Sequence, residues 1–417
     1  MISASEYHFL QIAMTNPHLP LEILDDIIDL LYNKPDALKR CCLVSKSWVP
    51  RTRKHLFAHI KLRSSSNLES WKKTFPDVAN SPGYHARSLF VACIRLVAAS
   101  DGEEGGWIRA FSGIKSLRID DNILNRGLRA SEGSLTPFHG ISPTLKSLHV
   151  GSIPVPYPGL FDFILSFPLL EHLGLTGLDG SQFNGNGPHE PRTVIPSTSP
   201  PLIGSLTFDI RTGGAEDVAR QLLDLPNGLH FHRLVLSGVC DMDLWWITEL
   251  VTRCSHTLEF LDIRYTLRCT FSYIRVCTGG LLLFPVWSEP GSFDLSKATK
   301  LRDLIFRPGS ERVGWITLAL QTITPEHRDL QIAVRVPQFL TDFDAYIEDY
   351  IGEATRREWL ELDRLLVQFW ELYSIRPVVG YENMGLVDES TEYCVGGLLP
   401  EVTKRRIIYP GVWPYGS

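Results

Sequence analysis

The chain has 417 residues, of which 44% are hydrophobic and 21% charged, and its formal net charge at pH 7 is -6. This composition is that of a folded globular protein and excludes wholesale disorder. The negative charge argues against a general nucleic-acid-binding or membrane-surface role, although it leaves room for a local basic patch. At about 150 residues per domain, the length predicts two or three domains.

No membrane or secretory segment is predicted. Gly280–Trp287 is apolar but short and contains Pro285, and Leu89–Ala99 is interrupted by Arg95, so neither approaches the ~20 residues that span a bilayer. The N-terminus lacks a basic region followed by an apolar core. The eight cysteines include no CxxC pair and follow no regular spacing, which favours reduced thiols in the cytosol or nucleus.

The N-terminal region predicts a small helical module. Apolar residues recur every four positions from Leu19 to Leu31, and Pro20 suits the first turn of a helix. A second helix is predicted near Asp36–Val44, and a third carries Trp48. About forty residues bury little core by themselves. The apolar faces therefore pack either on the rest of the chain or on a partner, and the second reading is favoured.

This region resembles the F-box family in both halves of its motif. The matching segments are Leu19-Pro20-x-Glu22-Ile23-Leu24-x-x-Ile27 and Leu43-Val44-Ser45-Lys46-Ser47-Trp48. In that family, the apolar helices bind the Skp-type adaptor of cullin–RING ubiquitin ligases. The resemblance therefore implies the adaptor, and through it the cullin and RING subunits, as partners. The implied adaptor contacts are Leu19, Pro20, Ile23, Leu24, Ile27, Leu43, Val44 and Trp48. Some of them must hold the helices together instead.

A six-residue pattern, apolar-x-x-Leu-x-apolar, recurs along the rest of the chain. Helix-like segments precede several copies, as in 161–167 and 244–251. Alternation of strand and helix at a period near ~28 residues is typical of a leucine-rich-repeat solenoid with a parallel sheet. The central leucines of the pattern are Leu89, Leu117, Leu148, Leu173, Leu206, Leu234, Leu261 and Leu304.

The repeats are irregular. The position after each strand that usually holds Asn or Cys has Asn122 in one copy and other residues elsewhere, so a different α/β layering stays open. Gly177–Pro201 is predicted to be a long exposed loop. Cys269–Pro290 is either a loop or a further irregular strand pair.

The C-terminal part is predicted to be a last, degenerate unit. An amphipathic helix begins near Arg356, and Leu372–Val379 is a candidate strand. Trp359–Asp363 and the tail from Leu399 to Ile408 are similar to the ends of leucine-rich F-box proteins of mushroom-forming fungi.

The predicted fold class is α/β: a small all-α F-box module followed by an irregular leucine-rich-repeat solenoid with a parallel sheet. The predicted boundaries are a tail over 1–15, the F-box over 16–63, the solenoid over 64–336, and a degenerate last repeat with a C-terminal cap over 337–417.

No catalytic residue, metal site or cofactor is predicted. His55 and His59 have a spacing that binds zinc on a helix but lack a third ligand. His189-Glu190 lacks the second histidine of a zinc protease, and the cysteines have no base partner. Trp245-Trp246 and Trp370 are either core or exposed anchors, and core is favoured.

The sequence therefore predicts a non-catalytic substrate receptor of a Skp–cullin–F-box ubiquitin ligase, which holds a target protein near the conjugating enzyme. A scaffold bound to the adaptor, without a ubiquitination role, is the alternative. The target is expected on the outward positions of the strands, where charge reversal should leave folding intact, or on the 177–201 loop. The outward positions named for it are Lys146, His149, Glu259 and Asp262. Neither nucleic acid nor a membrane is an expected partner.

Overall fold

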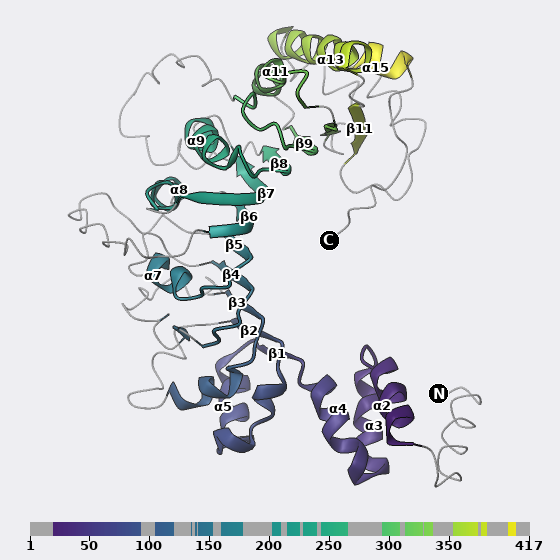
Figure 1. The fold of residues 1–417 in the computed structure, drawn as a ribbon, viewed down its shortest axis with the longest axis vertical. Coiled ribbons are helices and arrows are strands. Elements are labelled where there is room, and N and C mark those ends of the chain that lie inside the picture. The colour runs from purple at the N-terminus through teal and green to yellow at the C-terminus, as the bar shows by residue number, and fades with distance from the viewer. Residues whose placement is uncertain are drawn as a thin grey trace, which may run out of the picture. The chain divides into compact units, whose positions relative to one another are not determined.

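The computed structural model in Figure 1 describes residues 20–92, 105–120, 135, 138–139, 141–152, 160–177, 202–209, 215–225, 228–239, 243–265, 294–308, 313–327, 329–336, 353–373, 377–381 and 399–405. The chain divides into two compact units, one of residues 1–120 and 133–146 and the other of residues 121–132 and 147–417. Both contain helices and parallel strands, which confirms the predicted α/β class. Within the described ranges, no helix is both long and apolar enough to cross a bilayer.

A helical module, residues 20–58, opens the first unit. Its elements are α2 (Leu21–Leu30), α3 (Pro35–Val44), the 3-10 helix η1 (Lys46–Trp48) and α4 (Val49–Leu56). Its small core consists of buried Ile28, Leu38, Cys41 and Trp48, with Leu24, Leu31 and Leu56 packed against them. The helices predicted from the apolar periodicity are thus present, and Pro35 begins α3 where a missing N–H costs nothing.

The rest of the first unit contains a short parallel sheet. Its strands are β1 (His59–Leu62), β2 (Ser88–Ala92) and β3 (Ser116–Asp120), separated along the chain by α5 (Ser65–Thr74), η2 (Val78–Asn80), η3 (Pro82–His85) and η4 (Gly105–Phe111). Ile60 pairs with Leu89 and Leu89 with Leu117, all three buried. The leucine pattern therefore predicts β2 and β3 of this sheet but not β1, which has Ile60 at the same position.

Strand β1 corrects one expectation. His59 begins this strand and does not lie on the last helix of the module, which ends at Leu56. The pair His55 and His59 therefore lacks the single-helix geometry that its spacing suggested.

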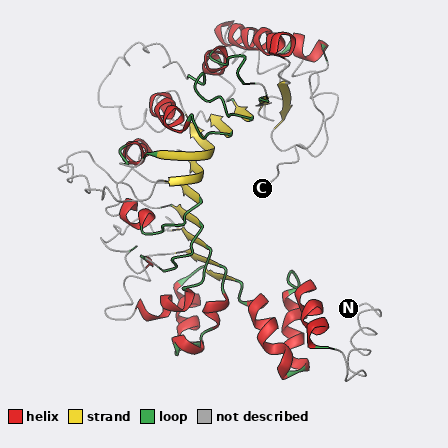
Figure 2. Cartoon of the chain, viewed as in Figure 1, coloured by secondary structure: helices red, strands yellow, loops and turns green. Residues whose placement is uncertain are grey.

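The second unit contains a longer parallel sheet whose strands follow chain order. They are β4 (Ser147–Gly151), β5 (His172–Thr176), β6 (Leu202–Asp209), β7 (Leu229–Val239), β8 (Phe260–Tyr265), β9 (Asp303–Arg307), β10 (Gln331–Val336) and β11 (Pro377–Tyr381). The helices are α7 (Leu160–Leu165), α8 (Ala215–Leu223), α9 (Leu244–Cys254), α11 (Gly314–Gln321), α13 (Glu353–Tyr373) and α15 (Pro400–Lys404). Figure 2 shows the strands stacked one above another.

A ladder of leucines forms the core of this sheet. The strand register aligns Leu148, Leu173, Leu206, Leu234, Leu261 and Leu304 in one row. The most exposed of them, Leu173, is 3% exposed. Ile332 continues the row on β10 opposite Leu304. The prediction that Leu148, Leu173, Leu206, Leu234 and Leu261 are buried in parallel strands is confirmed.

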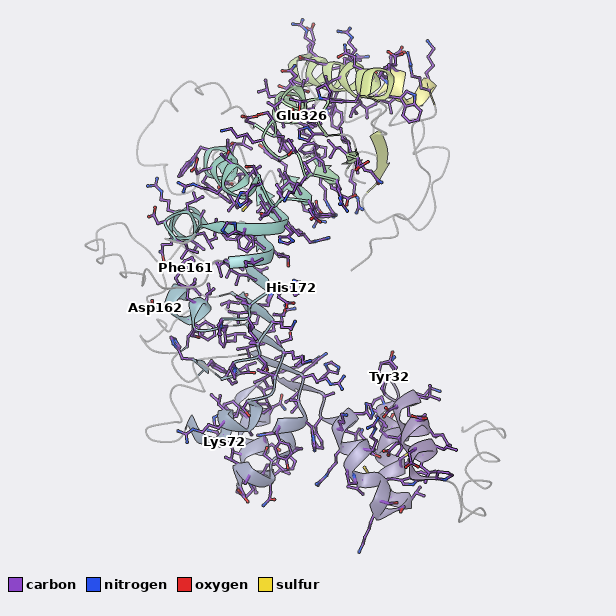
Figure 3. All side chains as sticks on the ribbon, viewed as in Figure 1. Tyr32, Lys72, Phe161, Asp162, His172 and Glu326 are labelled. Carbon is purple, nitrogen blue, oxygen red and sulfur yellow. The ribbon has the colours of Figure 1, made fainter. Side chains whose placement is uncertain are left out.

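Helices cover the ladder side of the sheet. Phe208 on β6 lies 5.5 Å from Trp246 on α9, and Phe306 on β9 lies 5.4 Å from Trp315 on α11, measured between ring centroids. Figure 1 shows α8 and α9 on the same side of the strands. We call the opposite side, to which the alternate residues point, the outer face. Figure 3 places His172 on the outer face, away from Phe161 of α7.

Helix α13 holds two other helices through its carboxylates. Glu358 Oε2 accepts hydrogen bonds from the backbone N–H groups of Val313 (3.0 Å) and Gly314 (2.9 Å), at the start of α11. Asp363 accepts from the N–H groups of Glu401 (2.8 Å) and Val402 (2.9 Å), in the first turn of α15. These N–H groups have no partner within their own helices, so α13 anchors both helix starts.

The predictions for the C-terminal elements and for the tryptophans are confirmed only in part. Helix α13 extends from Glu353 to Tyr373, so the strand predicted at Leu372–Val379 is displaced to β11, at Pro377–Tyr381. Trp246 is core, as favoured, but Trp245 and Trp370 are exposed. The N-terminal tail, Asn122, His189-Glu190 and the segments 178–201 and 269–290 lie outside the described residues.

Candidate protein-docking surface

Helix α2 carries two apolar stripes with different surroundings. Leu24, Ile28 and Leu31 follow the spacing i, i+4, i+7 and pack into the core of the module. Ile23 and Leu30, which are also seven residues apart, are 45% and 80% exposed. A single stripe would suffice to fold this helix onto its neighbours. The second stripe is an apolar surface that the module itself leaves in solvent.

More exposed apolar side chains follow on the same module. Leu43 at the end of α3 is 87% exposed and Val44 is 38% exposed. Tyr32, just after α2, is 62% exposed, and Figure 3 shows it projecting from the module. Exposed apolar surface of this kind commonly marks a protein-docking site. Leu30 and Tyr32 were not among the predicted contacts, because neither belongs to the quoted motif.

The predicted adaptor contacts divide between surface and core. Pro20, Ile23, Leu43 and Val44 are exposed, and Ile27 is half-buried. Leu24 is half-buried against the core, and Leu19 lies outside the described residues.

Trp48, a predicted adaptor contact, lies instead in the core of the module and is one of the residues that hold the helices together. It is 8% exposed and packs with Ile28, Leu38 and Cys41. Its large ring belongs to the core of the small module, where its apolar contacts stabilise the fold.

A polar tie fixes α2 to α4. Arg51 Nε donates to Asp29 Oδ1 at 2.6 Å, its Nη2 donates to Oδ2, and His55 Nε2 lies 2.7 Å from Oδ1. The Arg51 guanidinium holds the pKa of the Asp29 carboxyl well below its usual range, and His55 adds to this effect against the opposing influence of burial. The tie lies on the same helix as the exposed stripe and fixes its orientation. Local sequence patterns could not predict it, because Arg51 and His55 lie 22 and 26 residues from Asp29 along the chain.

The predicted target contacts lie in varied surroundings. In the first unit, Lys146 is exposed. In the second unit, His149 is half-buried over Gly174, where an added Cβ would meet its Nδ1 at 2.4 Å, and its Nε2 lies 3.0 Å from Thr176 Oγ1. Glu259 is half-buried and lies immediately before β8.

Asp262 requires a correction. It lies on the outer face, between buried Leu261 and Ile263, but it is only 4% exposed and is paired with Arg307. Reversing its charge would place two cations together at a buried position, so the expectation that Asp262→Lys leaves folding intact is wrong.

Two of the described cysteines, Cys41 and Cys254, have buried thiols. Burial raises the pKa of Cys254 to about 12 and also raises the pKa of Cys41, so both stay protonated at neutral pH. Across the described ranges, no group of three or more His, Cys, Asp or Glu side chains is placed to hold a metal ion.

No protein-family model and no curated protein matches the chain. The class that the structure defines is an α/β protein with a parallel sheet and a small N-terminal helical module that exposes apolar side chains.

Proposed function

We propose that this protein is a substrate receptor of a Skp–cullin–F-box ubiquitin ligase. In this proposal the helical module is an F-box that binds the Skp-type adaptor, and the parallel sheet belongs to an irregular leucine-rich-repeat solenoid that binds a target protein. The observation that carries the proposal is the exposed apolar surface of the module. It includes Ile23, Leu43 and Val44, which are positions of the two-part F-box motif.

The repeating sheet supports the second half of the proposal. Strands β4 to β9 each contribute one leucine to a continuous ladder, and their alternate residues form the outer face. A partner lying across such a face contacts several repeats at once. A binding surface of this kind needs no reactive side chain.

The proposed receptor acts by proximity. Holding a target lysine near the thioester of the conjugating enzyme raises its effective concentration, so that transfer becomes effectively intramolecular. The residues of this chain would then bind and position, while other subunits supply the bond chemistry.

Affinity purification from cells with the proteasome inhibited tests this function. We expect the tagged chain to recover the adaptor, a cullin and one or more ubiquitinated proteins. The variant Ile23→Asp/Leu43→Asp should lose the adaptor and the cullin together, since each aspartate would bring an uncompensated charge into a dry interface. Recovery of the adaptor without any cullin would instead support the alternative of a scaffold without a ubiquitination role.

A further inference from the structure

Strands β7 to β10 concentrate arginines on the outer face of the sheet. Arg264 on β8 pairs in register with Arg307 on β9. Arg335 on β10 follows Val334, whose register partner is Phe306, the residue before Arg307. We call Arg264, Arg307 and Arg335 the arginine row. Neighbouring strands lie about 4.8 Å apart, so the row crowds like charges, an arrangement that is unfavourable unless anions lie close to it.

One arginine of the row, Arg307, pairs with a carboxylate of the chain itself, Asp262. Arg307 donates to Asp262 from Nε to Oδ1 at 2.9 Å and from Nη2 to Oδ2 at 2.6 Å. This is the two-pronged geometry in which a guanidinium matches a carboxylate. The carboxylate comes from an adjacent position of the same face, so carboxylate binding is compatible with the local backbone.

The three guanidiniums of the arginine row together carry more N–H donors than the one carboxylate of Asp262 can use. The three arginines also make other interactions within the chain, but each guanidinium has five N–H donors. All three are half-buried, as is typical of arginines whose aliphatic stems lie on apolar surface while their charged ends reach solvent.

Arg233 on β7 extends the basic surface. Its guanidinium lies 3.6 Å from the centroid of the Phe260 ring, its register partner on β8. Stacking uses the face of the guanidinium and leaves the in-plane N–H groups at its edge. Arg233 is exposed. The strands β7 to β10 are thus net basic, with Asp262 and Asp303 as their acidic residues, although the whole chain carries a formal charge of -6.

We propose that the outer face of β7 to β10 binds an extended, unmodified acidic segment, rich in Asp and Glu, of a partner protein. A segment that runs across β8 to β10 meets one arginine on each strand, so that several carboxylates are engaged in succession, and a segment that also bends along β7 reaches Arg233, four residues before the position paired with Arg264. This inference deepens the proposed function by naming the chemistry of the target, and it rests on that function only in identifying the partner as a ubiquitination target.

Fluorescence anisotropy with the purified full chain and a labelled Asp/Glu-rich peptide tests the proposal at about 50 mM salt. We expect saturable binding that Arg264→Gln/Arg335→Gln weakens about tenfold or more, since each change removes charge-assisted hydrogen bonds. The matched control is Arg253→Gln/Arg357→Gln, which removes two exposed arginines from α9 and α13 and should change binding less than about twofold.

Arg307 is left unchanged because it holds buried Asp262. The variant Arg264→Lys/Arg335→Lys keeps the charge but loses the planar fork, and it should weaken binding at least about threefold even if the glutamine variant fails to fold. Equal effects of the test and control variants would overturn the proposal, as would a chain that binds a phosphorylated peptide or an oligonucleotide but not the acidic peptide. The adaptor plays no part in this measurement, so its outcome is separate from that of the proposed function.

Discussion

Asp29 illustrates how single side chains set the geometry of the helical module. It is the shared acceptor for Arg51 and His55, and it joins α2 to α4 across a core that contains few buried side chains. The Asp29 side chain is 37% exposed, so solvent screens part of its pairing energy. The tie therefore orients the helices more than it stabilises them.

Removing this carboxylate should have a pH-dependent cost. Because pairing lowers the pKa of folded Asp29 below its unfolded value near ~3.9, its contribution is present above that pH and is lost as pH falls toward the folded pKa. We expect Asp29→Asn to lower the free energy of unfolding by about 1 kcal/mol at pH 7 after allowance for screening, with a smaller loss at acidic pH. Denaturant unfolding at pH 7 and pH 3 measures this difference.

Asp36→Asn is the control, since Asp36 is 84% exposed and pairs only locally with Lys39. A cost for Asp29→Asn that matches the control, or that does not shrink at low pH, would contradict the role given to the tie.

Gly204 is a residue whose identity the backbone requires. It has a φ of +99°, and a Cβ there would lie 1.9 Å from the carbonyl oxygen of Glu171, beside the register shift in β6. Gly204→Ala should lower the free energy of unfolding by more than about 2 kcal/mol, because strain and clash combine. Gly228→Ala is the matched control: its φ is +72°, but the nearest atom is 4.0 Å away. Similar costs for the two variants in denaturant unfolding would show that the clash is relieved.

Among the elements of the second unit, the strands of the parallel sheet are stabilised chiefly by the buried leucine ladder. Leu234 is fully buried between Leu206 and Leu261 in register. Leu234→Ala should cost roughly 2–5 kcal/mol, since it removes apolar contacts and leaves a cavity. Val235→Ala, on the half-buried outer face of the same strand, should cost clearly less. Equilibrium unfolding of both variants measures the difference, and equal costs would mean that Leu234 does not occupy a packed core.

The ladder also shows what the sequence could predict of the fold. A leucine flanked by apolar residues is a local signal. It located β2 to β8 of the described chain at intervals of 25 to 33 residues, and β9 after a wider gap of 43 residues. Strands β1 and β10 were not predicted. Isoleucines, Ile60 and Ile332, occupy their ladder positions, so the leucine pattern is absent there. Pairings between residues far apart in the sequence were not predicted either. Examples are the ion pair of Asp262 with Arg307 and the hydrogen bonds of Glu358 to the start of α11.

The candidate docking surface was predictable in part. The motif identified Ile23, Leu43 and Val44, which are exposed, but it could not separate them from Trp48, which is buried. Apolar residues at helical spacing carry the same signal whether they face a core or a partner. Only the packed structure shows which apolar stripes are buried in the module's own core and which remain exposed.

The whole molecule has two kinds of surface, which would serve two kinds of partner under the proposed function. The helical module presents apolar side chains, which suit a dry interface with the adaptor. The outer face of β7 to β10 presents arginines, which suit an acidic segment of a target. The proposed receptor function would need such a division, since the adaptor would have to stay bound while targets bind and leave.

The central claim is that the exposed apolar residues of the module bind a Skp-type adaptor. Calorimetric titration of the purified adaptor into the full chain tests it most directly, with Ile23→Asp/Leu43→Asp as the test variant. Leu169→Asp/Ile203→Asp is the control, because these residues of the second unit are 54% and 46% exposed. We expect saturable binding by the unchanged chain and the control, and a loss of affinity of about 100-fold or more in the test variant at an unchanged unfolding midpoint. Absence of binding by the unchanged chain, or equal affinity of the test and control variants, would contradict it.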